Sequence, residues 1–372
     1  MTGGQDAIAL AERVLAILEE GSFSSTYKYA LFIAILDLCI EKTEASGAPP
    51  SSLTTRELAT KVVELCWNHV APYGTHGTLR FGGGRGEQAE VLRRIENVRA
   101  RWGDERSDTV FRFQTVHPEQ YERLLDFVEW KLIEMPIPRL QRLGRGEEDR
   151  FLYEYNWPVP VRRSVVTAYQ KKARKAFANS LSLQPGVAEG LVRLNGLLRP
   201  IFYREWAVRV AKLNNLPEAG LESFLFDVDR ASLDAVREPL CDLQGRCCFY
   251  CDGRISSRAD VDHFIPWSRY RDDGLDNLVT AHGRCNNSKR DFLASAEHVE
   301  HWVERTRRLD ADLTVLAQAC GWPRDRDRSA AVVRAVYLRL PASARLWRSP
   351  DEFDPVDHPR IRRALATHAD ET

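Results

Sequence analysis

The apolar positions near the start of the chain recur at helical spacing. Residues 6–20 place their apolar side chains on one helical face, which predicts an amphipathic helix. Residues 24–42 are apolar on most sides and predict a second, more buried helix. Thr54 and Glu57 have the spacing of a capping box, so a third helix is expected over 55–70.

A glycine-rich stretch over 71–86 precedes another helical pattern at 87–101. Such a stretch can hold a phosphate at a helix N-terminus. Here it lacks the spacing and the Lys-Ser/Thr pair of a phosphate-binding loop, which favours an ordinary loop or hairpin. The order of helices and hairpin is also typical of winged-helix DNA-binding domains, and that alternative stays open.

The middle of the chain mixes patterns. Residues 109–116 and 150–157 are strand-like, and residues 118–134 have a helical pattern between them. Residues 217–234 are acidic and are expected to connect this region to the next unit.

Residues 162–212 form a basic segment. Eleven Lys or Arg oppose two Glu there, although the whole chain balances 53 Lys or Arg against 53 Asp or Glu. Interleaved aromatic residues favour contact with a nucleic-acid backbone, whereas a solvated helix face over core aromatics is the alternative. The residues predicted to contact DNA are Arg162, Arg163, Lys171, Lys172, Arg174 and Lys175.

Composition limits the protein class. The 372 residues are 44% hydrophobic and 28% charged, which is typical of a folded globular protein and excludes a disordered chain. A net charge of zero excludes a uniformly basic, histone-like binder. The most apolar run, 30–40, contains Asp37 and is too short for a bilayer span. The N-terminus lacks the pattern of an export signal, so a cytoplasmic protein without membrane partners is expected.

Five of the eight cysteines lie between Cys241 and Cys285, which indicates metal binding in a reducing compartment and not a disulfide framework. Within this stretch, a C-x-x-C pair and an H-x-x-C pair supply four ligands of the kind that a closed structural zinc site uses. The ligands predicted for zinc are Cys248, Cys251, His282 and Cys285. Cys247 leaves one alternative open, because it can replace Cys248 with a longer loop.

Between the two cysteine pairs lies a second, chemically different cluster. Asp262 and His263 end a strand-like alternation, Asn277 lies in a polar turn, and Asn286 follows the last zinc ligand. Carboxylate and amide oxygens suit Mg²⁺ or Mn²⁺ better than zinc. A neutral histidine beside such a metal can accept a proton from water.

These residues resemble the signature of the HNH endonucleases, in the branch whose frame is held by zinc. The resemblance rests on the segments 262–266, 276–278 and 285–289 with their flanking knuckles, and it covers about 241–292. It implies a ββα-metal fold. The zinc-bound branch usually carries Cys at the position of His282, although His is also a zinc ligand.

The resemblance assigns a role to each matching residue. Asp262 and Asn286 would bind the catalytic Mg²⁺ or Mn²⁺, and His263 would be the general base. Asn277 would fix the loop that orients His263, or lie nearer the metal as in some relatives. Lys289 would contact a phosphate, and the products would carry 5′-phosphate ends.

The expected fold class is α+β and mainly helical. Four regions are predicted: a helical N-terminal domain over 1–105, a mixed region over 106–235, the nuclease unit over 236–300, and a helical extension over 301–372. In the last part of the chain, His298 and His301 are expected to face solvent.

The predicted function is a metal-dependent DNA endonuclease of bacterial restriction or phage defence. The alternatives are a zinc-containing DNA-binding protein that does not cleave, and a nuclease directed at RNA. Symmetric cutting of both strands needs two centres, hence a homodimer or two binding events. A partner protein from a defence system is a further hypothesis.

Overall fold

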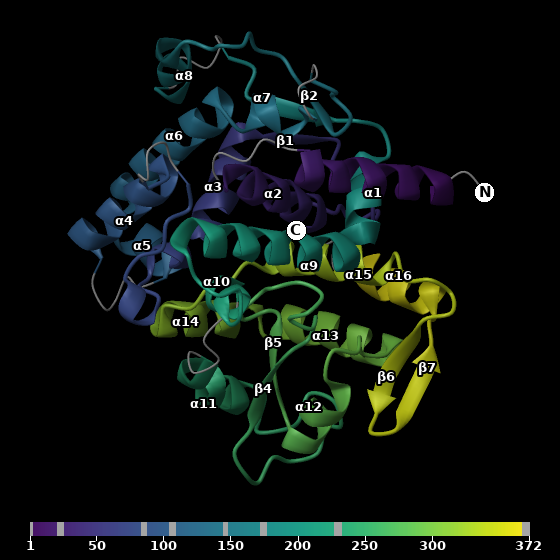
Figure 1. Ribbon diagram of the computed structural model, residues 1–372. Coiled ribbons are helices and arrows are strands. Elements are labelled where there is room, and N and C mark those ends of the chain that lie inside the picture. Colours follow the sequence, from purple (N-terminus) through teal and green to yellow (C-terminus); the bar gives the residue numbers. More distant parts are fainter. Residues whose placement is uncertain are drawn as a thin grey trace. The chain divides into compact units, whose positions relative to one another are not determined.

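The chain folds as two compact units (Figure 1). In this computed structural model, unit 1 comprises 1–39 and 50–227, and unit 2 comprises 40–49 and 228–372. The fold is α+β and 58% helical, as expected. The finer division into four regions stays a prediction. The residues that the structure describes are 3–20, 26–82, 88–103, 109–143, 148–171, 177–226 and 233–366.

Unit 1 is built mainly from helices, and the patterns at its start are confirmed. The predicted capping box is present, because the Thr54 hydroxyl accepts from the Glu57 N–H and the Glu57 carboxylate accepts from the Thr54 N–H. The described helices are α1 (Gly3–Glu20), α2 (Tyr27–Glu41), α3 (Thr55–Cys66), α4 (Glu90–Trp102), α5 (Val110–Val116), α6 (Pro118–Glu134), α7 (Ile137–Leu140), α8 (Arg163–Gln170), α9 (Val187–Asn214) and α10 (Leu221–Phe226), with 3-10 turns η1 (Asn68–Val70) and η2 (Gly74–His76).

The prediction of a strand over 109–116 is wrong. These residues form α5, whose first turn is capped by the Thr109 hydroxyl accepting from the Arg112 N–H. Phe113 is fully buried against Trp67, with ring centroids 5.0 Å apart. Over seven residues the apolar pattern fits both periods, so tertiary packing decides which one forms.

The second strand-like segment, 150–157, does contain a strand that pairs with another. Part of 150–157 forms β2 (Tyr153–Tyr155), which joins an antiparallel sheet of order β1-β3-β2. The other strands are β1 (Ser52–Thr54) and β3 (Ser180–Leu183). The sheet therefore ties together three segments that are far apart along the chain.

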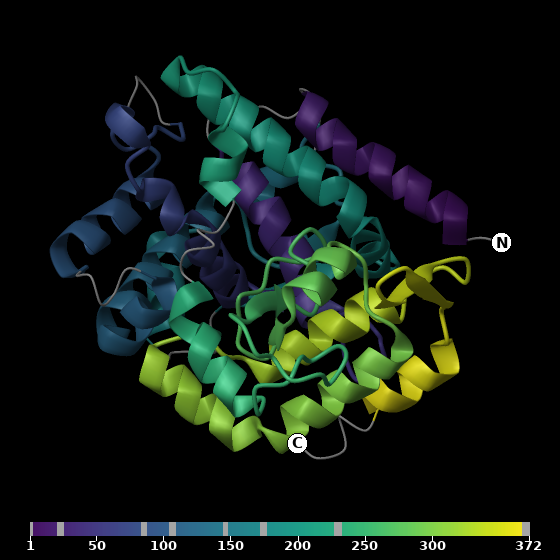
Figure 2. The ribbon, with the colours of Figure 1, turned by 90° about the horizontal axis from the view of Figure 1, so that it is seen from below.

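Helices α1 and α9 run side by side in unit 1 (Figure 2). The two helices approach closely at Gly190, where an added Cβ would lie 2.5 Å from the Leu10 side chain and would force that side chain to shift. The aromatic residues of α9 face inward, and Phe202 and Trp206 are fully buried. For these aromatics, the alternative of core packing is the one that the structure supports.

Unit 2 surrounds a two-stranded antiparallel hairpin of β4 and β5, in which Asp262 pairs with Val279 and His263 with Leu278. The described residues after 300 form mainly helices and also the hairpin β6–β7. The elements of unit 2 are α11 (Asp234–Leu243), β4 (Asp260–His263), β5 (Leu278–Ala281), α12 (Gly283–Lys289), α13 (Ala296–Arg308), α14 (Asp310–Cys320), α15 (Arg326–Tyr337), β6 (Arg345–Ser349), β7 (Glu352–Pro355) and α16 (His358–Ala366).

Apolar side chains of the helices α11 and α14 pack against the β4–β5 hairpin and the loop before β5. Leu240, Leu275, Leu278 and Leu313 are fully buried in this cluster, and Trp322 is 8% exposed. Helix α14, from the C-terminal part of the chain, therefore shares a core with the β4–β5 hairpin. No described helix is both long and apolar enough to cross a lipid bilayer.

A short segment from early in the sequence also belongs to unit 2. The carbonyl oxygens of Thr43 and Gly47 accept hydrogen bonds from Arg334 and Arg339 at 3.2 and 2.8 Å. Glu41, at the end of α2, accepts from the hydroxyl of Tyr270. The chain therefore enters unit 2 once before it completes unit 1.

Candidate functional site

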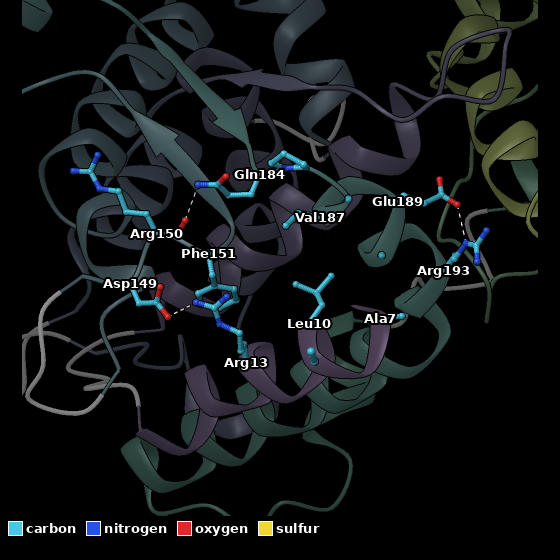
Figure 3. Close-up of a pocket in the computed structure, with 14 residues that line it drawn as sticks. Ala7, Leu10, Arg13, Asp149, Arg150, Phe151, Gln184, Val187, Glu189 and Arg193 are labelled. Atoms are coloured by element: carbon cyan, nitrogen blue, oxygen red, sulfur yellow. Dashed lines mark hydrogen bonds and ion pairs between the residues drawn. The ribbon is translucent and has the colours of Figure 1, made fainter. Parts of the chain in front are cut away.

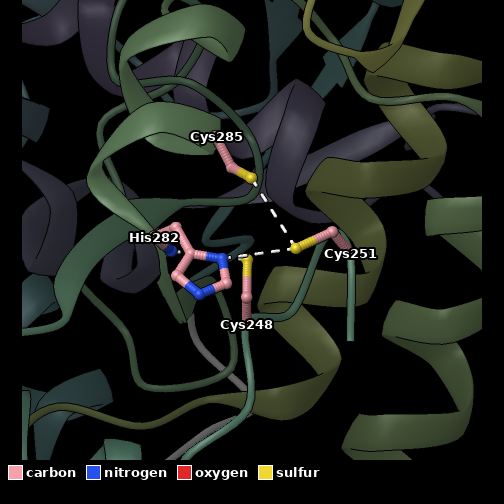
Figure 4. Close-up of side chains that lie close together, drawn as sticks. All are labelled: Cys248, Cys251, His282 and Cys285. Carbon is pink, nitrogen blue, oxygen red and sulfur yellow. Dashed lines mark hydrogen bonds between the residues drawn. The ribbon is translucent and has the colours of Figure 1, made fainter. Parts of the chain in front are cut away.

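Three thiols and an imidazole gather at the start of α12. The side chains point toward one another (Figure 4), and their ligand atoms all lie within 4.8 Å of one another. The cluster contains the predicted residues Cys248, Cys251, His282 and Cys285. Cys247 is not among them, and its Sγ lies 3.5 Å from the carbonyl oxygen of Gly245. Three sulfurs and one imidazole nitrogen are the donor set of a structural zinc site, so this cluster fits zinc.

Groups next to the cluster fix the tautomer of His282 and lower the pKa of Cys251. His282 Nε2 lies 3.2 Å from the Arg254 carbonyl oxygen, which only accepts, so Nε2 carries the hydrogen and Nδ1 is the ligand atom. Burial is the largest single influence on the Cys251 thiol and raises its pKa, but hydrogen bonds with the Gly253 N–H, the His282 ring, Cys248 and Cys285 together lower that pKa to about 7. A thiol with this pKa loses its proton to a metal readily.

The second cluster lies on β4 and α12. Asp262 has an 11% exposed side chain, and both of its described hydrogen-bonding partners reach the same oxygen, Oδ2. The Tyr250 hydroxyl donates to it at 2.6 Å, and the Lys289 ammonium lies 3.0 Å away. Within the described part of the chain, Oδ1 receives no hydrogen bond and is available to a cation.

Tyr250 is a site residue that the sequence did not reveal. It is buried, and burial together with the nearby Asp262 carboxylate raises the pKa of its hydroxyl well above the usual value. The hydroxyl therefore stays protonated and acts as a donor to Asp262. Its ring also lies against the Lys289 ammonium, 5.7 Å from the ring centroid.

Lys289 is buried between α12 and the end of β4. Its side chain is 0% exposed, and the ammonium donates to the His263 carbonyl oxygen at 2.9 Å as well as contacting Asp262. Lys289 therefore joins α12 to the end of β4 and compensates the Asp262 charge. Its contact with a phosphate stays a prediction.

Asn286 lies one helical turn before Lys289 on α12. Its amide Nδ2 donates to Asp260 Oδ2 at 3.1 Å, which fixes the amide orientation and leaves Oδ1 as the free acceptor among the described contacts. The face of α12 that carries Asn286 and Lys289 therefore lies along the β4 residues Asp260 and Asp262. The oxygens of Asp262 and Asn286 suit Mg²⁺ or Mn²⁺.

His263 ends β4 with a 16% exposed side chain. Its Nε2 lies 2.8 Å from Oδ1 of Asp273, on the loop between β4 and β5. The Trp267 ring packs beside the imidazole, with centroids 5.3 Å apart. Nothing in the spacing of the motif indicated Asp273, because it lies ten residues further along the chain.

Asn277 braces the loop that carries Asp273. Its Oδ1 accepts from the Ile265 N–H at 2.8 Å, and its Nδ2 donates to the carbonyl oxygens of Asp272 and Ile265 at 2.9 and 3.3 Å. Asn277 is 2% exposed. All of these partners are backbone groups, which supports the bracing role over a place at the metal.

His298 does not face solvent, which corrects another expectation. It is buried, and its ring nitrogens lie 2.9 Å from the Ser295 hydroxyl and 3.0 Å from the Tyr250 carbonyl oxygen. Burial lowers the pKa of its imidazole. Together with Trp347, whose ring stacks on it, His298 supports the backbone that carries Tyr250.

The basic segment is only partly described. Arg162, Arg163 and Lys171 are exposed at the ends of α8, in unit 1. Lys172, Arg174 and Lys175 lie outside the described residues. Further along, Arg199 is buried and paired with Asp37 at 2.5 Å, so it belongs to the core.

Residues 248–295 match the family model of the HNH endonucleases. The match spans the C-x-x-C and H-x-x-C pairs, β4, β5 and α12, and it identifies this part of unit 2 as an HNH region. No curated protein and no solved structure matches the chain. The rest of the chain, unit 1 included, is without a family match.

Unit 1 contains a cavity of about 620 Å³ beside the N-terminus of α9 (Figure 3). The three arginines on its wall pair with acids: Arg13 with Asp149, Arg193 with Glu189 at 2.7 Å, and Arg150 with Glu148 and Glu154 at 3.3 and 2.9 Å. The wall is therefore close to electrically neutral, and its charges stabilise one another.

Proposed function

We propose that this protein is a metal-dependent endonuclease that hydrolyses DNA phosphodiester bonds in the HNH region. One observation carries the proposal: His263 is held by a carboxylate at Nε2, while the adjacent Asp262 and the facing Asn286 each keep one oxygen available. A base and two oxygen ligands therefore lie on β4 and on the facing helix α12. This combination supports phosphodiester hydrolysis.

The chain's own residues supply three functions in this mechanism. The Nδ1 atom of His263 accepts a proton from the attacking water, because Nε2 is occupied by Asp273. Asp262 Oδ1 and Asn286 Oδ1 would hold the divalent cation, and Lys289 and Tyr250 keep Asp262 oriented. A bound Mg²⁺ or Mn²⁺ supplies Lewis-acid stabilisation of the scissile phosphate and the leaving oxygen. Attack on phosphorus with loss of the 3′ oxygen leaves a 5′-phosphate end.

The zinc cluster has a structural part in this proposal. Its ligands come from the turn before β4 and from the start of α12, and these elements carry the catalytic residues. A closed Cys3His site leaves no open position for a substrate. Zinc would therefore hold α12 against the hairpin while the second cation takes part in the reaction.

The decisive test uses purified protein with Mg²⁺ or Mn²⁺ on plain plasmid, modified plasmid and RNA. Wild type should cut DNA, and His263→Ala should lower the rate by about 10² to 10⁴ while DNA affinity and zinc content are retained. Cleavage by His263→Ala at the wild-type rate would refute the assignment. DNA binding without cleavage would support the non-cleaving alternative, and preference for RNA the third hypothesis.

The biological role is proposed as restriction or phage defence. Unit 1 would provide a separate DNA-contacting surface, with Arg162, Arg163 and Lys171 exposed on it. Reversing these three residues to Glu should weaken DNA binding and reduce its salt dependence. Unchanged affinity and an unchanged salt slope would return this part of the segment to an ordinary solvated surface. Dependence of the plasmid assay on DNA modification would identify the restriction class.

A further inference from the structure

The loop between β4 and β5 presents a carboxylate to the histidine proposed as the base. Asp273 Oδ1 lies 2.8 Å from His263 Nε2, and the two side chains are 19% and 16% exposed. A carboxylate only accepts hydrogen bonds, so the neutral ring donates Nε2–H to it. The lone pair is then on Nδ1.

The loop is built to hold Asp273 in place without using the Asp273 side chain. The Asp273 carbonyl oxygen accepts from the Trp322 indole N–H at 2.6 Å. The neighbouring Asp272 carboxylate accepts from the Gly274 N–H and from the Ser329 hydroxyl, each at 3.0 Å. Asn277 binds the Asp272 carbonyl oxygen at 2.9 Å. The Asp273 carboxylate is therefore the part of this loop that is directed at the imidazole.

We propose that Asp273 is the positioning residue of the catalytic histidine. It fixes the Nε2–H tautomer and the ring orientation of His263, so that Nδ1 faces the attacking water. This inference rests on the proposed nuclease function, although the ring tautomer is a property of the resting protein. Holding the base in the reactive orientation lowers the barrier by removing unproductive geometries.

The kinetic test compares Asp273→Ala and Asp273→Asn with wild type in single-turnover cleavage of plasmid with Mn²⁺. Asp273→Ala should lower kcat by about 10- to 100-fold, because the ring is no longer held in the reactive orientation. The amide of Asp273→Asn can donate its N–H to Nε2 and hold the other tautomer, so kcat should fall at least as far. KM for DNA and the half-saturating Mn²⁺ concentration should stay within about twofold, because neither variant touches the oxygen ligands.

Asp291→Ala serves as the matched control, because it removes an exposed carboxylate of the same unit. It should keep wild-type kcat. A melting temperature equal to that of wild type is expected for Asp273→Ala, since the loop is anchored by Trp322, Ser329 and Asn277. A drop in kcat that is matched by a drop in melting temperature would point to a merely structural role and contradict the proposal.

A spectroscopic arm does not depend on cleavage. Long-range ¹H–¹⁵N NMR of ¹⁵N-histidine-labelled protein, at about pH 8.5 where an ordinary histidine is neutral, reports which ring nitrogen carries hydrogen. The His263 signals are those lost in His263→Ala. Wild type should show the Nε2–H form, and Asp273→Asn, whose amide donates to Nε2, should shift the ring toward the Nδ1–H form.

The two proposals fail differently. A wild-type protein that cuts no nucleic acid refutes the nuclease function, while the NMR result still tests the tautomer. A wild type that cuts DNA, together with an Asp273→Ala variant of equal kcat, refutes the role of Asp273 alone. The Nδ1–H form of His263 in wild type would also overturn the inference.

Discussion

Replacing Asn277 by alanine tests whether its amide braces the site or binds the metal. The side chain makes three hydrogen bonds to buried backbone groups: one from Ile265 N–H and two to the carbonyl oxygens of Asp272 and Ile265. A net contribution of about 1 kcal/mol for each bond predicts that Asn277→Ala lowers the opening free energy of this loop by about 3 kcal/mol. The backbone groups left behind are buried and lose their partner.

Hydrogen exchange of the Ile265 amide measures this effect directly, because that N–H is the donor to Asn277 Oδ1. A loss of about 3 kcal/mol corresponds to exchange about 100-fold faster under conditions where the opening is at equilibrium. Asn287→Ala is the matched control, since Asn287 is exposed on α12, and a surface change of this kind alters stability by at most about 0.5 kcal/mol.

The same variant separates the two roles through its metal dependence. A bracing residue loosens the loop that carries Asp273, so Asn277→Ala should lower kcat and leave the half-saturating Mn²⁺ concentration unchanged. An unchanged exchange rate of Ile265, or a rise of tenfold or more in the Mn²⁺ requirement, would refute the reasoning. The first result would mean that the hydrogen bonds contribute nothing, and the second that the amide contacts the cation.

Three further outcomes are expected. Metal analysis of purified protein should find about one zinc per chain. Cys251→Ser should lose this zinc, and His282→Cys should keep it. Absence of zinc from native protein would contradict the closed site. Tyr250→Phe should raise the Mn²⁺ concentration needed for half-maximal cleavage about tenfold, since Asp262 loses one of its two donors; an unchanged requirement would exclude a positioning role for Tyr250. His69 is fully buried in unit 1, and burial lowers its pKa to about 4. Between pH of about 6.5, the ordinary pKa, and pH of about 4, His69 binds a proton in the unfolded chain but not in the folded chain. The free energy of unfolding should therefore fall as the pH falls through this range, by at most about 3 kcal/mol. Denaturation at several pH values checks this against His69→Phe, which should lack that part of the dependence.

The sequence alone determined the chemistry of the HNH region. Two pairs of candidate ligands have the short spacing that lets both members of a pair bind one metal ion. The pairs are Cys248 with Cys251 and His282 with Cys285, and the structure brings all four together. Such pairs can be recognised in the sequence because the two ligands of each pair are only three residues apart. Only the contact between the two pairs depends on the tertiary fold. The helical pattern of 118–134 was equally readable, because it repeats over several turns and coincides with α6.

Tertiary structure decided the partners that complete the site. The hairpin, α12 and the β4–β5 loop fold against one another, and this brings three partners into contact. Tyr250 contacts Asp262, Asp260 contacts Asn286, and Asp273 contacts His263. A single acid or tyrosine has no pattern of its own along the chain, so its sequence position does not indicate its partner.

Burial gave other residues surroundings that their residue type does not indicate. Lys289 and His298 have the polar side chains of surface residues, yet both lie in the interior with compensating hydrogen bonds. The strand-like pattern of 109–116 became a helix because Phe113 packs against Trp67. In each case the outcome depends on which distant segment covers the side chain, since the free energy of burial belongs to the contact and not to the residue.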